Sequence, residues 1–361
     1  YLGKTIQVVP HITDEIKRNI KLLGQKYHYD FVITEIGGTI GDIESAPFLE
    51  AIRQMKWELG KRAINLHLTY VPYLKAAGEL KTKPTQHSVK ELQSVGIQPD
   101  VLVLRTEKHL DDDIRKKVAA FCNVDFDCVV QSEDLPSIYD VPINMLNQGL
   151  DEAILRKCGE QIGDKPALGP WREFLDRQRK ATKEVHIGLV GKYDLQDAYK
   201  SIREGLLQAG VYNDHKTIIT FINSEELTEQ NVEEKLKGQD GVVICPGFGQ
   251  RGIEGKIIAA HYTRTHNIPT FGICLGMQMM VIEFARNVLG YKDANSREID
   301  EKTPHNVIDI MEEQKNITNM GGTMRLGAYE CVLRQGSHTF NIYKQEHIQE
   351  RHRHRYEFNN S

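Results

Sequence analysis

The sequence predicts an α/β protein of two domains, each built on a central, mainly parallel β-sheet. Short apolar runs typical of buried strands, such as residues 30–35 and 241–245, alternate with helical segments such as 47–59. Several of these runs end in glycine-rich turns, which is where α/β sheets bind ligands. A length of 361 residues suits two domains, and 40% hydrophobic residues are enough for their cores.

Composition and charge narrow the classes of partner. The formal net charge of −4 is nearly balanced, so it favours neither nucleic-acid nor membrane binding. No apolar run approaches the ~20 residues that cross a bilayer. The six cysteines form no C-x-x-C pair and are too sparse for a disulfide framework, which favours a reducing, cytoplasmic location without a zinc site. The chain opens at Tyr1 without a signal peptide, so a targeting segment could have been lost.

The first domain opens with a helix and then a loop rich in acids and glycines. Residues 3–5, Gly-Lys-Thr, imitate the end of a phosphate-binding P-loop, but the preceding glycine is absent and we treat them as a decoy. Thr13 is a candidate cap of the first helix. The apolar run 30–35 predicts a buried strand, and Glu35 then begins the loop 35–45. Its spacing is as compatible with a turn of solvated acids as with ligand binding.

The rest of the first domain alternates strands and helices. Residues 63–71 and 99–104 predict strands, and 47–59 and 111–121 predict helices. Between them, residues 81–88 combine two lysines, two threonines and a glutamine with a proline. Such side chains can hold a phosphate and a base through charge and hydroxyl groups. Composition alone still favours a solvated lysine loop.

A weakly patterned, charged stretch separates the two domains. Residues 159–184 carry glycines, prolines and one helical segment, which together predict a linker. Beyond it, residues 185–193, 218–222 and 241–245 predict strands of a second sheet. The last of these runs into a glycine loop, 246–252, whose backbone N–H groups suit an oxyanion hole, although a tight turn has the same composition.

The stretch around which the chain is organised is 271–278, Phe-Gly-Ile-Cys-Leu-Gly-Met-Gln. Residues 267–270 predict the start of the strand before it, and an apolar helix follows. Cys274 lies between Gly272 and Gly276, a pattern that places a nucleophile on a sharp strand-to-helix turn. The N–H groups and dipole of a helix N-terminus lower the pKa of a thiol, so we expect an activated nucleophile. The elbow pattern disfavours the alternative, an inert core cysteine.

Three polar segments complete the second domain, namely residues 295–298, 321–327 and 351–357. Arginine and histidine alternate through 351–355, so a strand there would carry the arginines on one face and the histidines on the other. The run is too short to indicate a nucleic-acid site.

Residues 272–278 resemble the nucleophile elbow of class I glutamine amidotransferases, and two further segments narrow the resemblance to the CTP synthase family. Residues 35–45 and 81–88 are similar to the synthase loops of that family, the second over all eight positions. The resemblance covers nearly the whole chain. It implies a P-loop-type synthase domain followed by a flavodoxin-like class I amidotransferase domain, both truncated.

The resemblance also implies boundaries and an activity. The C-terminal part of the synthase domain spans 1–158, the linker 159–184 and the amidotransferase domain 185–361. The activity is that of a ligase, the ATP-dependent amination of UTP to CTP with ammonia from glutamine, in pyrimidine nucleotide synthesis. The family's P-loop and the His-Pro-Glu of its Cys-His-Glu triad are missing here, so we expect the chain as given to be inactive.

The resemblance assigns roles to particular residues. Cys274 is the nucleophile, and Glu35 binds Mg²⁺. The glutamine-binding residues are Gly247, Leu275, Gly276, Met277, Gln278, Glu298 and Arg353. The UTP- and CTP-binding residues are Asp42, Ile43, Glu44, Lys81, Thr82, Lys83, Pro84, Thr85, Gln86 and Lys117. Glu133, Asp134 and Leu135 lie against the adenine of ATP. The family has two glycines after the proline of the oxyanion loop where this chain has one, so the register of Gly247 stays open.

Regulation and assembly follow from the same resemblance. The implied cofactor is Mg²⁺, with ATP as co-substrate, GTP as activator, CTP as feedback inhibitor and a homotetramer as the assembly. Residues 251–255 resemble the segment linked to GTP activation. Two alternatives remain open: a class I amidotransferase of another pathway, against which 81–88 argue, and a non-catalytic fragment or assembly module that retains the nucleotide pocket.

Overall fold

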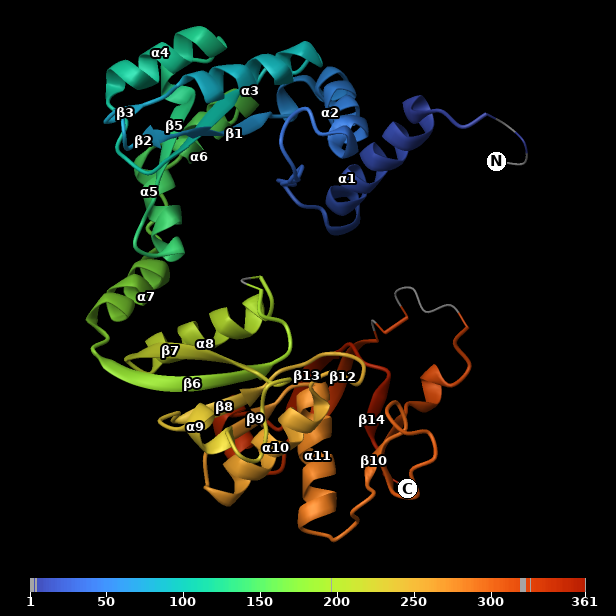
Figure 1. Ribbon diagram of the computed structural model, residues 1–361. Coiled ribbons are helices and arrows are strands. Elements are labelled where there is room, and N and C mark those ends of the chain that lie inside the picture. The colour runs from blue at the N-terminus through green and yellow to red at the C-terminus, as the bar shows by residue number, and fades with distance from the viewer. Residues whose placement is uncertain (1–2, 4, 196, 319–322, 325, 361) are drawn as a thin grey trace. The chain divides into compact units, whose positions relative to one another are not determined.

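The computed structural model describes residues 3, 5–195, 197–318, 323–324 and 326–360. The chain falls into two compact units, Tyr1–Leu168 and Gly169–Ser361, which we describe separately. Both are α/β units with parallel sheets, as the sequence predicts (Figure 1). No helix within the described ranges is long and apolar enough to cross a membrane.

The first unit is built on a parallel sheet of three strands in the order β1-β4-β5. These strands are β1 (Leu66–Val71), β4 (Val101–Thr106) and β5 (Val129–Glu133). Leu66 lies opposite Val101, and Leu102 lies opposite Val129. The strands predicted at 63–71 and 99–104 are therefore confirmed, with starts two or three residues later. A short antiparallel hairpin, β2 (Tyr73–Leu74) and β3 (Glu79–Leu80), follows β1.

The strand predicted at 30–35 is wrong. The structure has extended loop there, and Ile33 is 95% exposed. An apolar run becomes a strand only where a neighbouring strand supplies backbone partners, and in the part of the chain described here none pairs with this segment.

Over its described residues, the first unit also has six α-helices. They are α1 (Thr13–Tyr27), α2 (Ala46–Leu59), α3 (Lys83–Ser94), α4 (Asp112–Cys122), α5 (Val141–Asn147) and α6 (Leu150–Cys158). Asp111 caps α4, because its carboxylate accepts the Ile114 N–H at 2.8 Å. The predicted cap at Thr13 is wrong: Thr13 is the first helical residue, and its hydroxyl donates to the Pro10 carbonyl at 3.2 Å.

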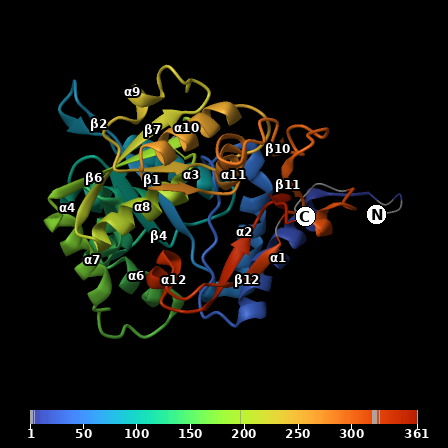
Figure 2. The ribbon, with the colours of Figure 1, turned by 90° about the horizontal axis from the view of Figure 1, so that it is seen from below.

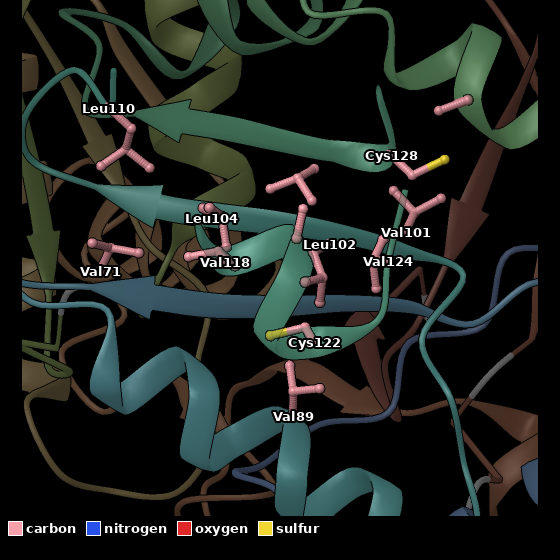
Figure 3. Close-up of a cluster of buried hydrophobic side chains, with 13 residues drawn as sticks. Val71, Val89, Val101, Leu102, Leu104, Leu110, Val118, Cys122, Val124 and Cys128 are labelled. Atoms are coloured by element: carbon pink, nitrogen blue, oxygen red, sulfur yellow. The ribbon is translucent and has the colours of Figure 1, made fainter. Parts of the chain in front are cut away.

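The core of the first unit forms where α3 and α4 meet the sheet. Figure 3 shows Val89 from α3 and Cys122 from α4 beside strand residues such as Leu102 and Leu104. Leu102, Leu104 and Cys122 are completely buried. Burial of such side chains stabilises the unit by about 1.5–3 kcal/mol each.

The second unit begins with α7 (Gly169–Lys180) and contains a parallel sheet in the order β7-β6-β8-β9. Its strands are β6 (Lys183–Gly191), β7 (His215–Asn223), β8 (Gly241–Ile244) and β9 (Thr270–Gly272). In chain order this is 2-1-3-4, the order of flavodoxin-like folds. Such sheets bind ligands at the carboxyl ends of their strands, next to the switch point between the first and third.

Helices α8 (Lys200–Tyr212), α9 (Val232–Leu236) and α10 (Ile253–Thr265) connect these strands, and α11 (Leu275–Asn287) follows the last of them, β9. Figure 2 shows α10 and α11, which pack against each other, in orange. The buried carboxylate of Glu283 on α11 joins the two, since it accepts Arg264 at 2.8 Å and lies 2.8 Å from His261. Because both partners of the Glu283 carboxylate lie on α10, this interaction fixes the position of α11 along α10.

The remaining strands form two small sheets. One has the order β10-β11-β14, with β10 (Asn295–Ser296), β11 (Asn306–Ile310) and β14 (Tyr356–Phe358). The other pairs β12 (Gly327–Val332) with β13 (His347–His352), and α12 (His338–Tyr343) lies between them in the chain. Because β13 ends at His352, the face alternation predicted through 351–355 holds only for its first two residues. In the 321–327 motif, Gly321, Gly322 and Arg325 lie outside the described residues.

We expect Leu104→Ala to destabilise the first unit by about 2–5 kcal/mol, because it removes a fully buried side chain and leaves a cavity. The matched control is Leu68→Ala on β1, whose side chain is 61% exposed, and which should change stability by less than about 1 kcal/mol. Hydrogen exchange of the β4 and β5 amides measures both. Equal effects of the two substitutions would refute this placement of the core.

Candidate active site

Cys274 lies at the turn between β9 and α11, at the N-cap position of the helix. Its backbone has φ 52° and ψ −110°, a combination that an L-residue seldom adopts. Strained backbone of this kind persists where the surrounding structure holds it in place, and it is typical of a nucleophile elbow. The side chain lies, partly buried, at the turn beyond the end of β9, so the structure has the strand-to-helix elbow that the sequence pattern predicts.

The two flanking glycines are required by close contacts. A Cβ on Gly276 would lie 1.9 Å from the Ile244 carbonyl oxygen, and a Cβ on Gly272 would lie 2.6 Å from the Met277 nitrogen. Neither contact is possible for any other residue without movement of the backbone. The strand and the helix can therefore meet at the elbow only because both positions are glycine.

The pKa of the Cys274 thiol differs from the sequence-based expectation. Burial raises this pKa above its usual value, and the negative charge of Glu298 raises it further. The Leu275 backbone N–H and the Lys256 ammonium lower it, as expected of a helix N-terminus and a nearby cation, but burial outweighs both. The prediction that the pKa of the Cys274 thiol is lowered overall is therefore wrong.

A buried lysine holds the loop that was predicted to form the oxyanion hole. The Lys192 ammonium, at the end of β6, donates to the Phe248 carbonyl and to the Gly249 carbonyl, the latter at 3.4 Å. A Cβ on Gly247 would lie 2.9 Å from Cε of Lys192, so the loop fits closely over this side chain. Burial lowers the pKa of Lys192, Arg251 lowers it further, and Glu298 raises it. Sequence analysis missed this residue, although a lysine directly after a buried strand is a usable signal.

The predicted glutamine-binding residues are brought together in part. Leu275, Gly276 and Gln278 are buried in the first turn of α11, and the Gln278 amide donates to the Tyr356 carbonyl at 2.9 Å. Met277 is partly exposed. Glu298 follows β10, and its charge acts on Cys274 and Lys192. Arg353 follows β13 and is exposed, and no interaction between Arg353 and Cys274 is found among the described residues.

No described histidine partners Cys274. The candidates after it in the chain are His305, His338, His347, His352 and His354. His305 lies 2.7 Å from Asp293, His347 lies 2.8 Å from Glu330, and His352 stacks on Tyr329. Within the described ranges, no hydrogen bond joins a histidine to Cys274, and the carboxylate that acts on its thiol is that of Glu298.

The first unit has a cavity of about 610 Å³ between α1, α2 and the loop before α2. Its lining includes Glu35, Asp42 and Glu44, three of the residues predicted to bind metal or nucleotide. The Asp42 carboxylate accepts the Thr39 N–H at 2.9 Å and so shapes the loop. Ile43 is 82% exposed. The three carboxylates line one hollow, but their oxygens do not all lie within 4.8 Å of one another, so in this structure they do not form a single cluster of metal ligands.

The predicted pyrimidine clamp lies at the start of α3. Thr82, Thr85 and Gln86 are buried, and their side chains hold the turn: Gln86 donates to Thr82 at 3.2 Å, and Thr85 donates to the Tyr70 carbonyl at 3.0 Å. Pro84 lies in the first turn, where its missing N–H has no consequence. Lys81 pairs with Glu79.

Two other lysines of the predicted clamp remain accessible. The Lys83 ammonium lies 5.7 Å from the centre of the Phe121 ring, and Lys117 is exposed on α4. The acidic loop contacts the second half of the same helix, since a Cβ on Gly41 would lie 3.8 Å from Cγ of Glu91 on α3. The buried polar residues thus fix the turn, and the lysines are free to meet a ligand.

The predicted ATP-contacting residues follow β5, at the carboxyl edge of the sheet. Asp134 pairs with Arg105 at 2.6 Å, Glu133 lies 2.8 Å from His109, and Leu135 is half-buried.

In the second unit, Arg251 of the segment 251–255 pairs with Glu225 at 2.9 Å.

Comparison with protein families matches both units. The family model described as CTP synthase N-terminus matches residues 1–159, and the model described as class-I glutamine amidotransferase matches residues 194–361. The chain is similar to proteins named CTP synthase, with 74% identity to one from Bacteroides thetaiotaomicron and 71% to one from Bacteroides fragilis, over 100% of this chain in each case. It covers 67% and 68% of these relatives.

A third relative and one solved structure have the same name. The CTP synthase of Porphyromonas gingivalis is 64% identical over 99% of this chain and 67% of its own length. The glutaminase domain of Trypanosoma brucei CTPS with bound acivicin is 41% identical over 48% of this chain and 68% of that one, with a TM-score of 0.45.

We expect Gly276→Ala to destabilise the second unit by about 1–3 kcal/mol or more, because its Cβ would overlap the Ile244 carbonyl. The control is Gly205→Ala on α8, where a Cβ has no neighbour within 4 Å and the helix should become about 0.5–1 kcal/mol more stable. Urea unfolding of the two variants tests this. A neutral Gly276→Ala would show that the elbow is looser than described.

Proposed function

The chain belongs to the CTP synthase family, which converts UTP to CTP with nitrogen from glutamine, and from this premise we propose that Cys274 is its glutamine-hydrolysing nucleophile. The observation that carries the proposal is the strained backbone of Cys274 at the N-terminus of α11. The sulfur of Cys274 attacks the amide carbon of glutamine, the proton that the thiol gives up passes to the leaving nitrogen, and the carbon–nitrogen bond breaks to release ammonia. Water then cleaves the thioester and releases glutamate, which regenerates the thiol.

The surrounding residues have distinct roles in this proposal. The Leu275 N–H, and the N–H of Gly247 if the loop register matches that of the family, stabilise the oxyanion on the attacked carbon. Gly276, Met277 and Gln278 form the floor of the site in the first turn of α11. Glu298 accepts the α-amine of glutamine, and Arg353 pairs with its carboxylate. The charge of Glu298 at Cys274 supports its place in the site.

We propose that the first unit holds the amination site. ATP phosphorylates O4 of UTP. Ammonia then displaces phosphate from C4, the ring carbon that carries this oxygen. UTP and CTP bind through Asp42, Ile43, Glu44, Lys81, Thr82, Lys83, Pro84, Thr85, Gln86 and Lys117. Glu133, Asp134 and Leu135 contact the adenine of ATP.

We propose that Mg²⁺ binds in the acidic cavity of the first unit. Glu35 is the proposed protein ligand, and the neighbouring carboxylates of Asp42 and Glu44 line the same hollow. Carboxylate oxygen is the ligand that Mg²⁺ prefers. A bound ion would neutralise charge on the nucleotide phosphates.

The organisation of the chain follows the family in this proposal. Residues 1–158 belong to the synthase domain, 159–184 to the linker and 185–361 to the amidotransferase domain. The family uses ATP and GTP, and we propose that GTP activates the glutaminase through residues 251–255 and that CTP inhibits by feedback. We further propose a homotetramer that works in the cytoplasm.

Cys274→Ala in the intact protein should abolish glutamine-dependent CTP formation by roughly 10⁴-fold or more, because the thioester can no longer form. Synthesis with added ammonia should survive, since amination uses the first unit. Coupled assays with each nitrogen source separate the two reactions, and Cys331→Ala, at an exposed cysteine, is the control. If Cys274→Ala lowers CTP formation to the same degree with glutamine and with ammonia, the two reactions do not use separate sites.

Lys81→Ala should raise the UTP concentration needed for half-maximal rate by roughly 10- to 150-fold, because it removes a charge-assisted contact of about 1.5–3 kcal/mol. Glutamine hydrolysis without nucleotides should change little. Lys90→Ala, at an exposed lysine of the same helix α3, is the matched control. UTP titrations that give the same affinity for Lys81→Ala and the unsubstituted protein would refute the assignment.

A further inference from the structure

The loop between β8 and α10 is held by its carbonyl groups. Four of the five carbonyls from residue 245 to residue 249 accept a hydrogen bond from a side chain. The bonds run from Lys256 to Cys245 at 2.6 Å, from Tyr199 to Pro246 at 3.5 Å, and from Lys192 to Phe248 and to Gly249, the latter at 3.4 Å. Water can satisfy the carbonyls of a surface loop, so side-chain donors at four of them fix the orientation of its peptide groups.

The three donor side chains come from three separate elements. Lys192 follows β6 and is buried, Tyr199 is the N-cap residue of α8, and Lys256 on α10 is completely buried. The Tyr199 hydroxyl also accepts the Lys192 N–H at 3.2 Å, which connects two of the donors. Burial of an ammonium is unfavourable, and within the described ranges neither lysine forms an ion pair. Two buried ammonium groups that donate to carbonyls of one loop indicate that a fixed loop geometry is required.

The held carbonyls determine where the N–H groups of the loop point. In a trans peptide unit the carbonyl and the following N–H point in opposite directions, and no unit of this loop is cis. The Pro246 carbonyl shares its unit with the Gly247 N–H, and the Phe248 carbonyl shares its unit with the Gly249 N–H. Both N–H groups therefore point away from the side chains that hold the loop. In the part of the chain that the structure describes, neither N–H has a hydrogen-bond partner.

The same loop contacts the elbow. A Cβ on Gly247 would lie 2.9 Å from Cε of Lys192 and 3.5 Å from Cδ2 of Leu275, the first residue of α11. The Ile273 N–H donates to the Ile244 carbonyl at 3.0 Å, so the strand before the elbow is bonded to the strand before the loop. Gly247 therefore lies beside the residue whose N–H is the other proposed oxyanion donor.

We propose that Lys192, Tyr199 and Lys256 are positioning residues of the oxyanion hole. They hold the carbonyls of the loop, so that the Gly247 N–H stays turned away from them and available to the oxygen of the attacked amide. Hydrogen bonds to these carbonyls also polarise the peptide units, which strengthens their N–H groups as donors. The inference rests on the proposed function of the site, and it selects Gly247 for the register that the sequence left open. The Phe248 N–H is disfavoured, because its peptide unit has the one carbonyl of the five for which the described residues supply no donor.

The test compares two reactions of Cys274 in the intact protein. With glutamate γ-semialdehyde, the aldehyde analogue of glutamine, the sulfur bonds to the aldehyde carbon and the former carbonyl oxygen becomes the oxygen of a tetrahedral adduct, so affinity depends on the oxyanion hole. With iodoacetamide, the sulfur displaces iodide and no such oxygen forms. Inhibition constants measure the first reaction, and mass spectrometry of the Cys274 peptide measures the second.

Lys192→Met should weaken inhibition by the aldehyde about 10- to 100-fold and lower kcat for glutamine by a similar factor, because a displaced donor loses most of its effect. KM for glutamine and the rate of alkylation should change by less than about threefold, since neither depends on the oxyanion. Lys235→Met, at an exposed lysine of α9, is the matched control and should change none of these quantities.

Two further variants remove the other donors. Lys256→Met and Tyr199→Phe should act in the same direction as Lys192→Met. Tyr199→Phe deletes one oxygen and keeps the ring, so it decides the matter if the lysine variants do not fold. It should weaken inhibition by the aldehyde roughly 3- to 10-fold, as expected for one lost hydrogen bond. Tyr212→Phe, at an exposed tyrosine at the end of α8, is its control.

The outcomes separate this inference from the proposed function. Unchanged aldehyde inhibition and kcat in folded Lys192→Met would overturn the inference and leave the nucleophile assignment in place. Equal losses of aldehyde inhibition and of alkylation would show general damage to the site, which also overturns it. If Cys274→Ala still hydrolyses glutamine, the proposed function itself fails, and the inference fails with it.

Discussion

The candidate active site depends on one steric constraint, the contact between the start of α11 and the end of β8. Because Gly276 meets the Ile244 carbonyl where no Cβ fits, the helix can begin directly above the strand. Cys274, which precedes the first residue of this helix, has a positive φ of 52°. The loop 246–252, proposed to form the oxyanion hole, begins two residues beyond the same carbonyl, so the proposed donors and the nucleophile both lie next to Ile244.

The groups around Cys274 have opposing effects on the pKa of its thiol. Burial disfavours the thiolate, as does the carboxylate of Glu298, for which we propose binding of the substrate amine. The helix N-terminus and Lys256 act in the opposite direction. A substrate amine that neutralises Glu298 would remove one of the two opposing effects, so binding and ionisation are coupled in the proposed site.

Local pattern was enough for the elbow and for most of the sheet. The pattern Gly-x-Cys-x-Gly after an apolar run is compatible with few other local structures. The strands predicted at 63–71 and 99–104 have neighbouring strands to pair with in the fold. The run at 30–35 has the same local pattern but no partner, and partners are not visible in a short segment. Thr13 failed as a cap for a similar reason, since the helix begins one residue earlier than the local pattern predicts.

The buried lysines could not be predicted from local pattern. Lys192 and Lys256 each occur singly among apolar or small residues, where a lysine usually reaches solvent. Their importance arises from carbonyls of other segments, at Phe248 and Cys245, that meet them only in the folded chain. The family resemblance supplied the roles of Glu298 and Arg353, of which only Glu298 is seen to act on Cys274 in this structure.

The most direct test of the account is detection of the covalent intermediate. The intact protein is mixed with glutamine, quenched in acid and digested, and the peptide that contains Cys274 is weighed by mass spectrometry. The account predicts a glutamyl thioester on Cys274 that disappears on treatment with hydroxylamine. A glutamyl group on a different residue, or steady glutamate release in Cys274→Ala, would contradict it.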